Sequence, residues 1–278
     1  MTKKLFHIDA FTEEPFKGNP AAICFMQQDE SDSWLAAFAA EMNLPITAYI
    51  IPHPNTIQDN ATPSPDAHFS LRSFTPNTEM TLCGHATLAS AHALWESKVV
   101  SKKQNIVFHT KDELLTAKLS QLGIEIDLPL INTTPLDQQN LKKEIEALLN
   151  CDVIEIHQCG NRRLALLPDA EQLTQLNPDL GKLKSMDIEG LIITAASTQT
   201  LYDFVSRFFA PKVGVDEDHV TGSAHCALAS FWSQKTMKTQ FNAYQASPRS
   251  GSLKLTLKNN RVLIRGQAKT ILTGEIYE

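Results

Sequence analysis

The chain has 278 residues, 42% of them hydrophobic, which is enough to fill the core of one large domain or of two smaller ones. Its 25 Lys and Arg against 31 Asp and Glu give 25 − 31 = −6, a balance that disfavours a nucleic-acid partner. No run approaches the roughly 18 consecutive apolar residues of a membrane-spanning helix, and no secretory segment opens the chain, so a soluble cytoplasmic protein is expected.

Short apolar runs bounded by turn residues predict a chain dominated by β-strands. In chain order, the expected strands are 5–11, 21–26, 48–51, 69–74, 106–110, 114–120, 124–128, 153–157, 163–167, 191–195, 203–209, 242–246, 253–258 and 261–265. An Asn259-Asn260 turn is expected to join the last two. Helices are expected at 31–42, 84–95, 141–150, 172–176 and 222–232. Because helices do not alternate regularly with strands, the pattern favours an α+β fold over a doubly wound parallel sheet.

Two of the expected helices resemble copies of one element. Each follows an Arg-x-Phe-x-Pro segment, at 72–76 and 207–211, and opens at a glycine, Gly84 or Gly222. Alanine recurs two, five and seven residues after each glycine, and a tryptophan closes each run. Helices made of such small, uncharged residues are typical of a buried position inside a curved sheet. Coincidence is the alternative, but the shared lead-in favours a duplicated fold in which each half is a sheet around a central helix.

Polar residues precede both glycines, as expected for an anion site. The N–H groups at a helix N-terminus bind carboxylates or phosphates, and a glycine lets the ligand approach the backbone. If the halves face each other, the two helix ends converge on one small, negatively charged substrate. The candidate site then comprises Cys83, Gly84, His85, Asp218, Thr221, Gly222 and Ser223. The alternative is that both loops only cap buried helices.

Four segments carry a resemblance to a known family. They are Pro-Phe-Lys-Gly-Asn-Pro at 15–20, Phe-Thr-Pro with Cys-Gly-His-Ala-Thr at 74–87, Asp-x-Val-Thr-Gly-Ser-Ala-His-Cys at 218–226 and Ser-Pro-Arg-x-Gly at 247–251. In order and spacing they resemble the phenazine-biosynthesis-protein-like (PhzF-like) isomerase family. Within the first segment, Gly18 and Asn19 are expected to form a structural turn.

The resemblance implies a diaminopimelate-epimerase-like fold of two similar barrels, each a curved, mostly antiparallel sheet around a central helix, with the active site in the cleft between them. One barrel would comprise residues 1–122 with a returning C-terminal strand at about 268–278, and the other residues 123–267. The resemblance further implies a homodimer and an isomerase that needs no cofactor or metal. Its reaction would be proton transfer at a carbon of a small carboxylic acid.

One residue departs from the family's pattern. The resemblance places the family's catalytic Glu, in a Ser-Glu-Thr-Ala-Phe-like segment, at Ile46 of Leu-Pro-Ile-Thr-Ala-Tyr (44–49). Isoleucine neither donates nor accepts a proton, so the usual mechanism does not run unchanged. Either His85 or Cys83 takes the proton with help from Asp218, or the chain binds a small acid without catalysis, or Ile46 is an alteration of the natural sequence.

Two other site types are disfavoured by spacing. His92 lies two helical turns after His85 but no third ligand stands at metal-binding spacing, so no metal site is predicted. Ser223 and His225 would point about 200° apart on one helix, which excludes a nucleophile–base pair of a hydrolase.

Overall fold

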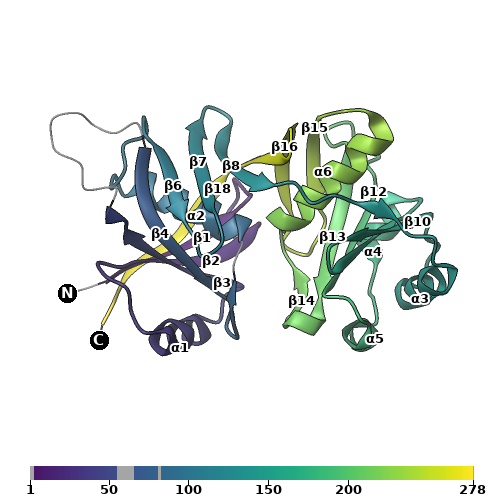
Figure 1. Ribbon diagram of the computed structural model, residues 1–278, viewed down its shortest axis with the longest axis horizontal. Coiled ribbons are helices and arrows are strands. Elements are labelled where there is room, and N and C mark those ends of the chain that lie inside the picture. The colour runs from purple at the N-terminus through teal and green to yellow at the C-terminus, as the bar shows by residue number, and fades with distance from the viewer. Residues whose placement is uncertain (1–2, 55–65, 81–82, 278) are drawn as a thin grey trace. The chain divides into compact units, whose positions relative to one another are not determined.

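The computed structural model describes residues 3–54, 66–80 and 83–277. The chain divides into two compact units (Figure 1): unit 1 is Met1–Leu128 with Leu263–Glu278, and unit 2 is Pro129–Val262. The expected divisions, after residues 122 and 267, lie a few residues away. Strand β8 (Gly123–Pro129) accounts for the first difference, because it pairs with β7 (Leu114–Ser120) and so extends the sheet of unit 1.

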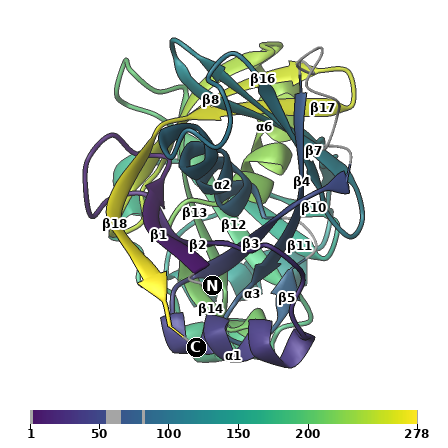
Figure 2. The same cartoon turned by 90° about the vertical axis from the view of Figure 1, so that its left-hand side faces the viewer.

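Unit 1 is a curved sheet with one helix inside it. Its further elements are β1 (Lys3–Ala10), β2 (Asn19–Phe25), α1 (Asp32–Met42), β3 (Ile46–Pro52), β4 (Asp66–Phe74), β5 (Glu79–Met80), α2 (Gly84–Glu96), β6 (Asn105–His109) and β18 (Ala268–Ile276). The strand order is β18-β1-β2-β3-β4-β6-β7-β8, with β5 beside β4. Strand β8 also pairs with β17 (Arg261–Gly266), which leads directly into β18, so the sheet returns to its own first edge. Figure 2 shows the strands arranged around α2.

Unit 2 repeats this plan. Its elements are β9 (Thr134–Pro135), α3 (Gln139–Leu149), β10 (Glu155–Cys159), β11 (Arg162–Leu166), α4 (Ala170–Gln175), α5 (Leu180–Ser185), β12 (Gly190–Ala196), β13 (Phe204–Ala210), a 3-10 turn (Pro211–Val213), β14 (Val215–Asp218), α6 (Gly222–Thr236), β15 (Gln240–Gln245) and β16 (Gly251–Lys258). The order is β9-β10-β11-β12-β13-β15-β16, with β14 beside β13.

The two units share strand directions as well as strand order. All these pairs are antiparallel except β2–β3 and β4–β6 in unit 1 and β11–β12 and β13–β15 in unit 2, which occupy equivalent places. Helix α2 follows the β4–β5 hairpin, and α6 follows the β13–β14 hairpin. The predicted α+β duplication is therefore confirmed.

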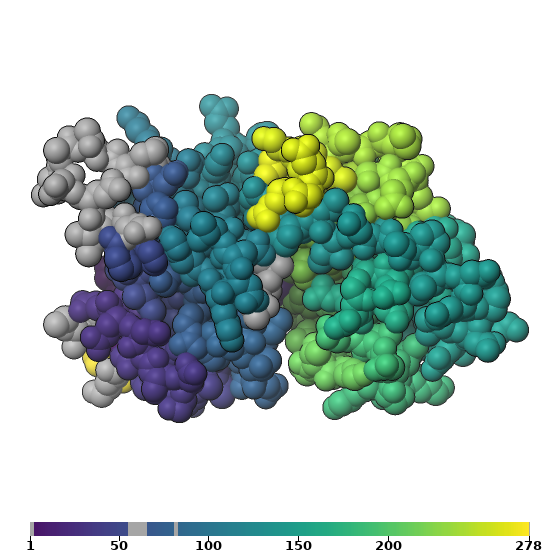
Figure 3. Space-filling view, in the orientation of Figure 1, coloured from purple at the N-terminus to yellow at the C-terminus, as the bar shows by residue number. Residues whose placement is uncertain are grey.

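Burial explains why the residues of the two central helices are small and uncharged. From Gly84 to Trp95 every residue of α2 except His92 is buried, and from Gly222 to Trp232 every residue of α6 except Ser223 is buried. Helix α2 contacts β1, β2, β3, β7 and β18, so only small side chains fit on several of its faces. On the face that Figure 3 shows, side chains cover the gaps that the ribbons leave within each unit.

Strand β18, of nine residues, was expected only from the family resemblance, and the other helices and strands that the sequence pattern does not predict are short. They are α5, of six residues, and the strands β5, β9 and β14, of two to four. Such lengths hold too few residues to show a hydrophobic period. The expected Asn259-Asn260 turn is present, and Asn259 adopts a positive φ of 57°. Among the described residues, no helix is long and apolar enough to cross a membrane.

Candidate functional site

The N-terminus of α2 brings together a thiol, an imidazole and an amide. Cys83 is the N-cap residue, and its Sγ lies 3.4 Å from Nδ1 of His85. The same Nδ1 lies 3.3 Å from Nδ2 of Asn19, the first residue of β2. In this orientation of the amide its nitrogen donates to Nδ1, which corresponds to the neutral imidazole tautomer with its proton on Nε2. His85 is only 7% exposed, whereas Cys83 is half-buried.

Asn19 is a site residue that sequence reasoning assigned to a structural turn. It is fully buried at the start of an otherwise apolar strand. Gly18 before it has φ +66°, and a Cβ there would lie 2.1 Å from the carbonyl oxygen of Ala10, so the turn accepts only glycine. The carboxylate of Asp9 accepts a hydrogen bond from the backbone N–H of Phe16 at 2.8 Å and holds the loop closed. The turn thus places the Asn19 amide against His85.

The N-terminus of α6 holds the other predicted residues. Thr221 is its N-cap, and the Thr221 hydroxyl donates to the carboxylate of Asp218 at 2.6 Å. Gln245 at the end of β15 accepts from the Thr221 backbone N–H at 2.8 Å and donates to the Asp218 carbonyl at 2.7 Å. The Ser223 hydroxyl accepts from Arg162 at 2.9 Å. Neither Gln245 nor Arg162 was predicted, because each lies far from the α6 motif in sequence.

The two central helices differ from three others in how they begin. Side chains of Ser31, Asp169 and Asp179 accept hydrogen bonds from the first turns of α1, α4 and α5. The side chains of Cys83 and Thr221 make no such bond, although threonine is a residue type that caps well, and Gln138 at the start of α3 makes none either. The N-termini of α2 and α6 therefore keep the donor character that an anion site requires.

Ile46 begins β3 and is 2% exposed. It pairs in parallel with Ala21 of β2, and the next residue, Thr47, is fully buried. An aliphatic side chain is accommodated here without a polar partner. The position that the resemblance assigns to a proton-transferring Glu is thus part of the apolar core of unit 1.

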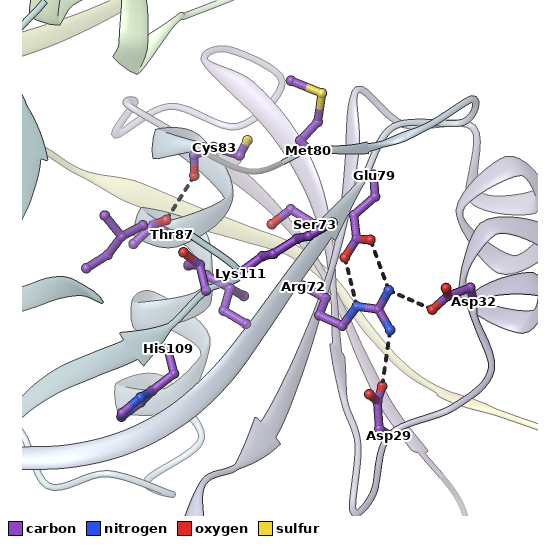
Figure 4. Close-up of a pocket in the computed structure, with 13 residues that line it drawn as sticks. Asp29, Asp32, Arg72, Ser73, Glu79, Met80, Cys83, Thr87, His109 and Lys111 are labelled. Carbon is purple, nitrogen blue, oxygen red and sulfur yellow. Dashed lines mark hydrogen bonds and ion pairs between the residues drawn. The ribbon is translucent and has the colours of Figure 1, made fainter. Parts of the chain in front are cut away.

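A pocket of about 360 Å³ in unit 1 has Cys83 in its wall. Figure 4 shows the opposite side of this pocket, where Arg72 is held by Glu79, Asp32 and Asp29. The pocket is within the usual size range of small-molecule sites, and Cys83 is the one predicted site residue that lines it. Cys83 therefore borders a pocket of small-molecule size.

The shared Arg-x-Phe-x-Pro segments have one structural role. In unit 1, Arg72 of β4 forms a two-pronged ion pair with Glu79 of β5, at 2.8 and 3.0 Å. In unit 2, Arg207 of β13 does the same with Glu217 of β14, at 2.7 and 2.8 Å. Each pair clamps the hairpin that leads into a central helix. The arginines thereby fix where the two helix N-termini begin.

The buried His225 on α6 predicts a pH-dependent loss of stability. Its Nδ1 donates to the Thr221 carbonyl at 2.8 Å, and complete burial lowers its pKa from 6.5 to about 4. Below pH 6.5 the unfolded chain binds a proton that the folded chain rejects, so stability falls as the pH drops from 6.5 towards 4. From pH 7 to pH 5 this one group is expected to remove about 2 kcal/mol from the free energy of unfolding.

The matched variant is His225→Asn, whose amide donates to the same carbonyl and does not titrate. Burial also lowers the pKa of His92, His109 and His157, but both proteins share these groups. Urea unfolding at pH 7 and pH 5 should show the larger loss in the native chain. Equal losses in the two proteins would contradict the assignment to His225.

Comparison with known families gives a match along most of the chain. The family described as phenazine biosynthesis-like protein (PhzC-PhzF) matches residues 8–274. The chain belongs to this family. It is 44% identical to an uncharacterized isomerase of Halalkalibacterium halodurans, over 99% of both chains, and 38% identical to the phenazine biosynthesis-like domain-containing protein of Homo sapiens, again over 99% of both. These findings confirm the resemblance, and the names of the relatives agree with the predicted enzyme class of isomerase.

Comparison with solved structures identifies the fold of this PhzC-PhzF family member. A PhzF family protein of Enterococcus faecalis superimposes with a TM-score of 0.88 at 34% identity, over 100% of both chains. A hydroxyproline epimerase of Agrobacterium vitis has a TM-score of 0.63 at 9% identity, covering 99% of this chain and 92% of the other. The second likeness shows the fold alone. Together they confirm the predicted epimerase-like architecture.

The predicted site residues fall into two groups. Cys83, Gly84 and His85 lie together in unit 1, and Asp218, Thr221, Gly222 and Ser223 lie together in unit 2. That both groups act on one substrate stays a prediction. In the described ranges no group of three or more His, Cys, Asp or Glu side chains is arranged to hold a metal ion, and the expected lack of metal and cofactor likewise stays a prediction.

Proposed function

We propose that this family member is a cofactor-independent isomerase that moves a proton between carbon positions of a small carboxylic acid, with Cys83 as the base in place of the missing Glu. The observation that carries the proposal is the 3.4 Å approach of Cys83 Sγ to His85 Nδ1 at the start of α2. Ile46 contributes nothing to proton transfer, because its side chain has no titratable group.

The surroundings of Cys83 favour its thiolate. A helix N-terminus stabilises negative charge, and a neighbouring imidazole accepts the thiol proton. The sulfur lies beside the imidazole ring, 3.4 Å from Nδ1 and 3.9 Å from Nε2 of His85. Nδ1 takes the thiol proton when the ring turns its lone pair from the Asn19 amide to the sulfur, and Asn19 holds the ring before that step. Asn19 is therefore a positioning residue for His85. The resulting thiolate takes a proton from carbon, and the imidazolium balances its charge until then.

The helix ends supply the groups that bind the acid. Backbone N–H groups after Gly84 and Gly222 attract a carboxylate and stabilise negative charge that develops as the proton leaves. The proton that Cys83 takes returns to the substrate from the Cys83 thiol, and the Asp218 carboxylate, which accepts from the Thr221 hydroxyl, assists by holding Thr221, the N-cap residue of α6, in place. The homodimer and the cytoplasmic location that the resemblance and composition suggest remain predictions.

Proton NMR in deuterium oxide tests the proposal. The native protein is incubated with a panel of small unsaturated, hydroxy and amino acids. Loss of a carbon-bound hydrogen signal next to a carboxylate, faster than in buffer, is the expected result. A panel in which no acid exchanges hydrogen would count against an isomerase of small acids.

Ile46 favours a second candidate, a protein that binds a small acid without catalysis. The Ile46→Glu variant separates the two candidates. If the native chain is inactive and the Glu variant exchanges hydrogen, the chain is a binding protein whose catalytic residue has been replaced. If the native chain is active and loses activity without Cys83, the thiol mechanism holds.

A further inference from the structure

Arg162 occupies an unusual place for a cation. It is the first residue of β11, and its Nη1 donates to the hydroxyl of Ser223, the second residue of α6. Its guanidinium lies over the ring of Phe208, 5.0 Å from the ring centre. The side chain is therefore held beside the positive end of a helix, where a carboxylate is favoured and a cation is not.

The charge of Arg162 is not balanced by an acidic side chain among the residues that the structure describes. Arg72, Arg207 and Arg265 each form an ion pair with a glutamate of their own unit. Arg162 differs: within the part of the chain that the structure describes, no carboxylate lies within 4.0 Å of it. The neighbouring Arg163 points to the opposite face of β11, and its Nη1 donates to the Arg162 carbonyl. The remaining donors of Arg162 suit an anion from outside the chain.

The duplication shows that the fold itself does not require this arginine. Arg162 pairs with Gly190, the first residue of β12, and in unit 1 Ala21 pairs with Ile46, the first residue of β3. Ala21 is thus the counterpart of Arg162, and it is fully buried. Where unit 1 has an alanine, unit 2 carries a guanidinium at the start of its central helix.

Gly190 fixes the position of Phe208, the aromatic ring on which Arg162 lies. A Cβ at Gly190 would lie 2.7 Å from two atoms of the Phe208 ring, so the ring packs directly against the glycine backbone. Phe208 is only 6% exposed. The guanidinium therefore rests on a rigid surface, and the Ser223 hydroxyl, which accepts from Arg162, still has its own hydrogen to donate to a ligand.

We propose that Arg162, with Ser223, binds a second carboxylate of the substrate, so that the substrate class of the site is the small dicarboxylic acids. This inference rests on the proposed function, because it takes the N-terminus of α6 as part of the acid-binding site. The planar guanidinium pairs with a carboxylate through two parallel hydrogen bonds, and the preorganised stacking on Phe208 reduces the entropy lost on binding.

The test compares binding of two acids of equal chain length, fumarate and crotonate, which differ by one carboxylate. The variant is Arg162→Gln, and Arg163→Gln is the control with the same change in net charge. Affinities are measured by NMR titration, and thermal unfolding checks that each variant is folded. We expect the native protein to bind fumarate at least about 10-fold more tightly than crotonate. Arg162→Gln should abolish that preference, whereas Arg163→Gln should retain it.

Three results would overturn the inference: equal affinity of the native protein for the two acids, an equal loss for both acids in Arg162→Gln, or no binding of fumarate at millimolar concentration. Because the readout is binding rather than turnover, it is independent of the isomerase proposal. A dicarboxylate preference that depends on Arg162, without hydrogen exchange, would support the acid site and refute only catalysis.

Discussion

Replacing Cys83 with serine is expected to lower the rate of carbon-bound hydrogen exchange by at least about 100-fold, the low end of what a positioned general base contributes. Serine matches cysteine in shape but remains protonated at neutral pH, so its hydroxyl does not act as the base. The N-terminus of α2 still binds the acid, and substrate affinity should change little. Exchange rates from proton NMR in deuterium oxide, measured at saturating substrate, give the result.

The control for this variant is Cys151→Ser, since Cys151 is also half-buried but lies at the edge of the unit 2 core, far in sequence from either helix start. Its exchange rate should match that of the native protein. His85→Gln identifies the base further. Loss of exchange in both Cys83→Ser and His85→Gln supports the thiol–imidazole pair, whereas loss only in His85→Gln would make His85 the base and contradict the role given to Cys83.

The central helices show why the fold was predictable from sequence. An alanine-rich, uncharged segment is typical of a buried helix that is thin enough to lie inside a curved sheet. Two such segments that follow the same Arg-x-Phe-x-Pro sequence indicate duplication. The division expected after residue 122 came from the family resemblance, and the two compact units divide after Leu128. Strand β8 is assigned by its pairing with β7 and β17, contacts that no local sequence pattern encodes.

The candidate site was predictable only where its residues are adjacent in sequence. Cys83 with His85, and Asp218 with Thr221, lie within three residues of each other, and the motifs show them directly. Asn19 reaches His85 from 66 residues away in sequence, and Arg162 reaches Ser223 from 61. These partners meet because β2 and β11 begin beside the central helices, which becomes visible only in three dimensions.

Replacing Arg207, which holds the β13–β14 hairpin, gives the largest expected change in stability. Arg207→Met should lower the free energy of unfolding by about 3–5 kcal/mol, because it leaves a mostly buried Glu217 carboxylate without its cation. It also removes the donor to the Leu176 carbonyl, at 2.6 Å from Nη1. Urea unfolding followed through the fluorescence of Trp232, which lies in the same unit, measures the loss.

Arg72→Met is the matched variant that the duplication provides. Arg72 holds the equivalent hairpin, but its side chain is 22% exposed against 8% for Arg207, and its partners Asp29 and Asp32 are largely exposed. Water therefore screens the charges left behind, and a loss of about 1 kcal/mol or less is expected. Adding Glu217→Leu to Arg207→Met should recover part of the larger loss by removing the stranded carboxylate. Similar losses in the two single variants would show that the clamps act through hairpin geometry rather than through the cost of a buried, uncompensated charge.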